Sequence, residues 1–260
     1  MLEFTYAEIM YAANRFLLPF FRIAGFFMVV PIFGSNLVTM RVRLMIAIVV
    51  TLSIVSQIKV VPEFEALSLQ SVPLVFNQLI IGIGLGFLVM VFIQVAALAG
   101  QIMAMQMGLG FAMMMDPVNG VNTVSIGQLY LMLFTMLYLA VDGHLITLAI
   151  MIESFNTLPL SLSGLDVGFY RYITTSSSWM FKSALKIALP AIIALYVVNF
   201  TFGVMSRAAQ QLQVFSIGFP FTIIYGLVVV WIVQGVLLPQ FNQLFSELQE
   251  MMHTLVSYPG

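Results

Sequence analysis

The chain has 260 residues, of which 62% are apolar and only 7% are charged. A soluble domain carries roughly 25% charged residues, so this composition excludes a water-soluble globule. The nine basic residues are scattered along the chain and form no clustered patch that could contact phosphates, so we expect no nucleic acid partner. The sequence therefore predicts an integral membrane protein whose apolar faces contact lipid, partner subunits or both.

Residue types that carry enzyme or metal chemistry are scarce. The chain has no cysteine and two histidines, too few ligands for a metal site and no thiolate nucleophile. The nucleotide-binding motif GxxxxGK(S/T) and the acyl-transfer motif GxSxG are both missing from the sequence. We expect no catalytic residue, no metal and no cofactor. The N-terminus lacks a basic n-region and a cleavage site, so we expect the whole chain to be mature.

Six apolar stretches with few or no charged residues predict membrane helices, because about 20 apolar residues cross the hydrocarbon layer. These stretches are residues 14–33, 42–58, 74–100, 128–152, 183–205 and 214–238. Lipid offers no partners to open strand edges, and the stretches lack the alternating pattern of a membrane barrel. The predicted fold class is all-α, a polytopic membrane protein with about six apolar helices.

The first stretch contains two arginines, Arg15 and Arg22, two helical turns apart. Arg15 is near enough to the end of the stretch to extend its charge into the interface. An arginine at the middle of a bilayer costs about 2.5 to 3.5 kcal/mol. We therefore expect Arg22 either to have a partner or to lie outside the hydrocarbon.

Small residues form a ridge on the third stretch and its continuation. They follow one another at four-residue spacing in two sets, Gly82 and Gly86, then Ala96, Gly100, Ala104 and Gly108. Small side chains in one row let a second backbone approach closely. The ridge predicts a helix-packing interface, either within this chain or with another subunit.

A methionine-rich segment comes next. Six of the 19 methionines lie within the 13 residues from 103 to 115. Gly108 and Gly110 weaken a helix there, and Asp116-Pro117 stops it. An apolar loop at membrane depth is tolerated only where protein encloses it or where it lines a cavity. The segment is either the end of a core helix, in which methionines fill gaps, or a deformable hydrophobic plug with Phe111 at its tip.

Three further features organise the rest of the chain. Asp142-Gly143-His144 is either a proton relay or a turn that ends a helix.

The segment 161–182, rich in Ser and Thr, is interpreted as a polar connection between two halves, and residues 183–260 after it predict a helical hairpin. An amphipathic C-terminal helix is predicted by one apolar stripe, which consists of Phe241, Leu244, Phe245, Leu248 and Met252.

Several of these motifs together carry a resemblance to a known family. They are Gln106-Met-Gly-Leu-Gly-Phe-Ala112, Asp116-Pro117 with Gly120, Gly127-Gln128, Asp142-Gly-His144 and Ser-Phe-Asn-Thr-Leu-Pro159. Over essentially its whole length the chain resembles the R-subunit (FliR) family of the bacterial flagellar type III export gate. That family is related to the T subunit of the injectisome export apparatus.

The resemblance implies an architecture and partners. Residues 1–160 would form a P-like half that includes the 106–122 loop, and residues 183–260 a Q-like hairpin with an amphipathic C-terminal helix. The implied partners are P-type and Q-type gate subunits, a B-type switch protein, the lipid membrane and unfolded export-substrate proteins. The implied location is the bacterial inner membrane, within the flagellar basal body. Subunits of this family are lifted largely out of the bilayer plane, so six apolar helices need not be six spans.

The resemblance also implies a role for the methionine-rich loop, which helps to close the pore in this family. The residues to which this role is carried over are Met107, Gly108, Gly110, Phe111, Met113, Met114 and Met115. Gln106 begins the matching segment, and Asp116 and Pro117 follow its methionines. We therefore expect a pore-forming, non-enzymatic subunit of the flagellar type III protein export gate with a hydrophobic plug.

Two other functions stay open at this point. One is a subunit of an injectisome export gate. The other is a proton-coupled small-molecule transporter, in which Asp142, His144 and Glu153 would titrate. A transporter predicts inverted repeats, which the two halves do not convincingly show. It would also be stable alone, whereas a gate subunit would need its partners.

Overall fold

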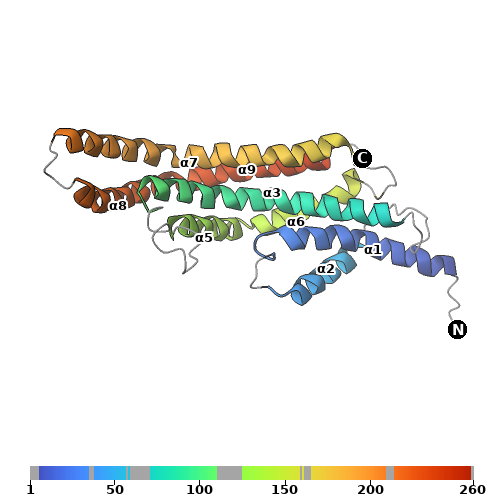
Figure 1. Ribbon diagram of the computed structural model, residues 1–260. Helices are drawn as coiled ribbons and strands as arrows, with labels where there is room; N and C mark the ends of the chain where they lie inside the picture. The colour runs from blue at the N-terminus through green and yellow to red at the C-terminus, as the bar shows by residue number, and fades with distance from the viewer. Residues whose placement is uncertain are drawn as a thin grey trace. The chain divides into compact units, whose positions relative to one another are not determined.

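The computed structural model describes residues 6–34, 38–56, 58, 71–109, 125–158, 160, 165–208 and 214–258. All regular elements in these ranges are helices, which confirms the predicted all-α class (Figure 1). In chain order they are α1 (Tyr6–Val29), α2 (Met40–Ile54), α3 (Ser71–Gln106), α5 (Ser125–Ala140), α6 (Gly143–Thr157), α7 (Val167–Ala208), α8 (Val214–Val233), the 3₁₀ turn η1 (Gln234–Val236) and α9 (Leu237–Val256).

Fewer helices than predicted have the length and composition to cross a membrane. Three segments within the described ranges do, namely Ser71–Gln106, Val167–Ala208 and Gly218–Val256. The broken pair Ile126–Ala140 and Gly143–Thr157 makes a fourth if it crosses as one span. The second predicted stretch gives only the 15 residues of α2, about 22 Å of helix against a hydrocarbon layer of about 30 Å. The prediction of about six apolar helices therefore does not translate into six spans here.

The predicted stretch 128–152 is divided between α5 and α6 because Asp142 leaves the helical conformation. Its backbone is left-handed, with φ 54° and ψ 28°, a region that Asp and Asn enter more readily than most residues. The carbonyl of Asp142 then accepts the N–H groups of Leu145 and Ile146 at 2.9 and 3.1 Å, in the first turn of α6. Of the two alternatives, Asp142-Gly143 is the turn that separates two helices.

The polar segment 161–182 is mostly helical, because α7 already begins at Val167. Residues 161–164 lie outside the described part of the chain. Asp166 caps the helix, since its carboxylate accepts the N–H of Gly168 at 2.9 Å. The hydroxyls that suggested a polar connection donate to carbonyls one turn back, as Thr174 does to Arg171 and Thr175 to Tyr172. Hydroxyls satisfied in this way are compatible with a helix.

The chain forms two compact units that interleave along the sequence. Unit 1 comprises Met1–Val91, Val141–Ser177 and Glu247–Gly260, and unit 2 comprises Phe92–Ala140 and Ser178–Ser246. An aromatic cluster forms the centre of unit 2, with ring centroids 5.3 to 6.2 Å apart, and consists of Phe92, Phe134, Tyr138, Phe241 and Phe245. Such ring pairs add about 0.5–1.5 kcal/mol each beyond the area they bury.

The amphipathic character of α9 is confirmed by burial. All five residues of the predicted apolar stripe, from Phe241 to Met252, are buried. Asn242, Gln243 and Glu250, which lie off that stripe, are exposed. A single apolar stripe therefore decides which face of α9 packs against the rest of the chain.

Candidate functional site

Arg22 on α1 is completely buried and holds three elements of unit 1 together. Its Nε donates to Oε1 of Gln78 on α3 at 2.8 Å. Its Nη1 donates to the carbonyl and hydroxyl oxygens of Ser154 on α6 at 2.8 and 3.0 Å, and Nη2 donates to the carbonyl of Leu158 at 2.8 Å. The guanidinium carbon also lies 4.4 Å from the ring centroid of Phe155. The expected partner for Arg22 is thus a set of neutral oxygens and one aromatic face.

These acceptors explain how a cation can be buried here. Ser154 and Leu158 lie at the C-terminal end of α6, where the helix dipole concentrates partial negative charge. The planar guanidinium can donate to several oxygens in fixed directions, which an ammonium cannot do. The end of α6 therefore supplies the negative potential that a carboxylate supplies at other buried arginines.

The first two glycines of the small-residue ridge bring α3 against α1 within unit 1. A methyl group at Gly82 would overlap the carbonyl oxygen of Arg22, and one at Gly86 would lie 2.9 Å from the carbonyl oxygen of Phe26. From the other side, a methyl group at Gly25 would lie 2.8 Å from the carbonyl oxygen of Leu79. The two backbones are close enough that only glycine fits at these positions.

Farther along α3, Gly100 performs the same function within unit 2. A methyl group there would lie 2.7 Å from the carbonyl oxygen of Ile126 on α5 and 2.8 Å from Cα of Gly127. Ala96 and Ala104, on the same ridge, are fully buried. At Gly82, Gly86 and Gly100, then, the close approach is made by helices of the same chain.

The predicted plug segment begins at a well-defined helix end. The N–H of Leu109 donates to the carbonyl of Ala104 at 3.1 Å, and the N–H of Gly108 donates to the carbonyl of Met105 at 3.0 Å. Gly108 has φ +85°, which glycine adopts at little cost. This pattern is a Schellman motif, the common end of an α-helix at glycine. Helix α3 therefore stops at the position where Gly108 was expected to weaken it.

Contacts within unit 2 hold the residues at this helix end. Met107 is fully buried, and a methyl group at Gly226 on α8 would overlap its side chain. Nδ2 of Asn199 on α7 donates to the carbonyl of Gln106 at 3.3 Å. The remaining predicted plug residues lie outside the described part of the chain, and they are Gly110, Phe111, Met113, Met114, Met115, Asp116 and Pro117.

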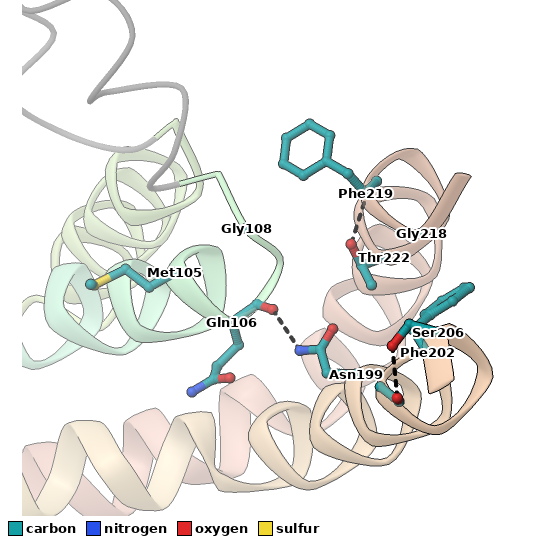
Figure 2. Close-up of a pocket in the computed structure, with 10 residues that line it drawn as sticks. Met105, Gln106, Gly108, Asn199, Phe202, Ser206, Gly218, Phe219 and Thr222 are labelled. Atoms are coloured by element: carbon teal, nitrogen blue, oxygen red, sulfur yellow. Dashed lines mark hydrogen bonds between the residues drawn. The ribbon is translucent and has the colours of Figure 1, made fainter. Parts of the chain in front are cut away.

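A cavity of about 370 Å³ opens beside this helix end, within unit 2 (Figure 2). Its lining comes from the end of α3, the last turns of α7 and the start of α8. The lining residues are Met105, Gln106, Gly108, Asn199, Phe202, Gly203, Ser206, Gly218, Phe219 and Thr222. The sequence prediction missed the residues from α7 and α8. A usable signal was present, since Asn199 and Ser206 are polar residues within or beside an otherwise apolar stretch.

Glu153, one of the two acidic residues of the transporter alternative, lies at a surface of unit 1. Oε2 of Glu153 is 3.8 Å from Nδ1 of His253, and both side chains are more than half exposed. In the part of the chain that the structure describes, no three His, Asp or Glu side chains gather in a way that could hold a metal ion. Glu153 is thus a solvated neighbour of His253 and does not lie in a buried relay.

Long apolar helices that pack at close glycine contacts define a helical membrane protein. The chain belongs to the bacterial export proteins, family 1, whose model matches residues 13–248. Similar relatives include proteins called Flagellar biosynthetic protein FliR. The one from Escherichia coli K12 is 30% identical over 99% of this chain and 98% of its own length. The one from Bacillus subtilis 168 is 27% identical over 94% and 95%, respectively.

The family confirms the resemblance based on the motifs around residues 106–159. A third relative of the same name, from Aquifex aeolicus VF5, is 27% identical over 82% of each chain. The match covers both units and is not confined to the motif-rich middle. The chain is accordingly a membrane component of protein export and not an enzyme.

Proposed function

We propose that this chain is the R subunit of the flagellar type III export gate, in the bacterial inner membrane within the flagellar basal body. The single observation that carries the proposal is the similarity to FliR proteins along nearly the whole chain. The proposed partners are P-type and Q-type gate subunits, a B-type switch protein and unfolded export substrates. Since the similar proteins are called flagellar, we favour this apparatus over an injectisome.

The proposed contribution to gating is a hydrophobic plug formed by the 106–122 loop. The plug would begin at Gln106–Gly108, where the Schellman motif and the buried Met107 hold the helix end. Because Gln106–Gly108, the root of the proposed plug, are held in place, the short segment that follows them can extend only over a limited distance from the end of α3. Methionine side chains re-pack around different shapes, so they can exclude ions when idle and surround a passing chain.

We also propose that residues 1–160 form the P-like half and residues 183–260 the Q-like hairpin. Contacts between α7 and α8 support the hairpin. The rings of Phe202 and Phe221 are 5.4 Å apart, and a methyl group at Gly218 would meet Phe202 at 3.4 Å. The two helices therefore pack side by side, as the arms of a hairpin do.

Native mass spectrometry of the tagged chain from its own bacterial membrane tests membership of the gate. The expected result is a discrete heteromer that contains one copy of this chain and several P-type and Q-type subunits. A gate subunit depends on partners to cover its exposed apolar helices, whereas a transporter does not. A stable monomer or homodimer in mild detergent would contradict the proposed function.

Replacing Phe111 with alanine tests the plug. The variant gate is expected to assemble normally but to leak small ions, because a large ring is removed from the proposed constriction. Ion permeability of membrane vesicles that contain the assembled gate measures this effect. Phe181→Ala is the matched control, since Phe181 lies on α7 with 59% of its surface exposed and outside the loop. Equal permeability of the two variants in fully assembled gates would refute the plug.

A further inference from the structure

The cavity beside the end of α3 has the size of a ligand site and is open to a ligand. Its volume of about 370 Å³ lies within the range of roughly 300–1,000 Å³ that small-molecule sites occupy. Met105 and Phe219 on its rim are 68% and 41% exposed. Phe202 and Phe219 give the cavity an aromatic lining, while the side chain of Met105 points along α3 away from the other labelled residues (Figure 2). The aromatic lining suits an apolar group.

The lack of charged side chains in the cavity lining restricts the ligand to an uncharged group. None of the ten lining residues has an ionisable side chain. An ion that entered an apolar cavity without a counter-charge would lose its hydration at a high cost. A phosphate headgroup, a carboxylate or a free amine therefore does not fit. The ligand is uncharged where it contacts the cavity.

The hydrogen bonds that the lining residues already make determine which donors and acceptors remain for a ligand. The hydroxyl of Ser206 donates to the carbonyl of Gly203 at 2.8 Å, and the hydroxyl of Thr222 donates to the carbonyl of Phe219 at 2.9 Å (Figure 2). The amide nitrogen of Asn199 donates to the carbonyl of Gln106. Each of these bonds uses one donor and leaves oxygen lone pairs, on both hydroxyls and on Oδ1 of Asn199, as acceptors, while Asn199 keeps a second N–H and the amide of Gln106 can both donate and accept. A complementary ligand combines an apolar body with N–H donors and with carbonyl acceptors, both of which a polypeptide backbone carries.

We propose that this cavity binds a short apolar segment of an unfolded polypeptide. An apolar side chain of the segment fills the cavity, and backbone N–H groups donate to Asn199 and Ser206. An extended chain presents both features at regular intervals, whereas an acyl chain of a lipid presents no donor. The inference rests on the proposed function and names a place where an export substrate contacts this subunit, next to the root of the proposed plug at Gly108.

Two glycines make a matched pair of test positions. A methyl group at Gly203 meets nothing within 4 Å, although Gly203 lines the cavity. A methyl group at Gly235 also meets nothing within 4 Å, and Gly235 does not line the cavity. Gly203→Leu therefore adds a side chain at the cavity lining without a clash with the described residues, and Gly235→Leu adds the same side chain elsewhere.

The probe is the peptide acetyl-Leu-Ala-Leu-Ala-amide with a photoreactive diazirine on one leucine, added to the full chain within its purified membrane complex. Labelled residues are located by mass spectrometry after irradiation. We expect label on α7 and α8 at the cavity, roughly tenfold less label in Gly203→Leu and unchanged label in Gly235→Leu. A peptide N-methylated at each backbone nitrogen should label the cavity several-fold less, because it has lost the N–H donors.

Three results would overturn the inference. The first is equal labelling of Gly203→Leu and the natural chain, and the second is equal labelling by the N-methylated peptide. The third is that a diazirine fatty acid labels the cavity and prevents peptide labelling at equal concentration, which would make the cavity a lipid site. Any of these results would leave the proposed function standing if native mass spectrometry still gives the heteromer. If the heteromer itself is not found, the proposed function fails and this inference fails with it.

Discussion

Replacing Gly82 with alanine is expected to lower the stability of the protein by about 3 kcal/mol, at the upper end of the usual cost of overpacking. The added methyl group would overlap the carbonyl oxygen of Arg22, which is backbone and cannot rotate away. Helices α1 and α3 would have to move apart to make room for the methyl group. The hydrogen bond from Arg22 to Gln78, one turn from Gly82, opposes this movement. Thermal unfolding in mild detergent, followed by loss of monodisperse protein, measures the effect.

Gly235→Ala is the control for this experiment. It makes the same chemical change where nothing lies within 4 Å of the new methyl group. Its melting temperature should therefore stay close to that of the natural chain. If Gly82→Ala melts at the same temperature as Gly235→Ala, the close approach of α1 and α3 at Gly82 does not exist in the folded protein.

The second large effect is expected for Arg22→Met, which should lower the free energy of unfolding of the natural chain by about 3 kcal/mol. Methionine retains an unbranched apolar stem of similar length. It cannot donate to the buried oxygens of Gln78, Ser154 and Leu158, and each buried polar group left without a partner costs about 1–3 kcal/mol. Arg22→Lys should restore only part of the loss, because an ammonium cannot reach these three groups in the same directions. Unfolding midpoints of the variants give the comparison.

A second substitution shows whether the loss comes from this network. Gln78→Leu in the Arg22→Met background should cost at least about 1 kcal/mol less than Gln78→Leu in the natural chain, because Oε1 of Gln78 already lacks its donor. Equal costs in the two backgrounds would mean that the two side chains are not coupled. In that case the effect of Arg22→Met would have to be assigned to lost packing.

The local signals in the sequence predicted the positions of the helices well. Apolar runs need helices in lipid, and each predicted run lies largely in one or two of the observed helices. Gly108 was expected to weaken α3, and the helix ends there because glycine adopts the left-handed conformation of a Schellman motif. The burial of the stripe from Phe241 to Met252 followed from helical periodicity alone. These predictions depend on neighbours within one or two turns.

Contacts between residues far apart in the sequence could not be predicted from these local patterns. The need of Arg22 for a partner could be predicted from the cost of burying it, but Ser154 is 132 residues away and nothing local pairs them. The serines and threonines near residue 175 were interpreted as part of a polar connection between two halves, because sequence alone does not reveal that their hydroxyls donate to carbonyl groups within a helix. The cavity joins the end of α3 to residues of α7 and α8, and Asn199 lies 93 residues from Gln106. The polar character of Asn199 and Ser206 was visible in the sequence, but nothing local places them beside the end of α3.

The length of α7 has a consequence for the height of the protein above the membrane. Its 42 residues give about 63 Å of helix, and the hydrocarbon layer is about 30 Å thick. Even at a tilt of about 40° the layer takes up only about 39 Å of helix, so more than about 20 Å of α7 has to stand in water or against another protein. The N-terminal part of α7, with Arg171, Lys182 and its satisfied hydroxyls, is suited to that position. A polypeptide that follows α7 from end to end therefore travels farther than the bilayer is thick.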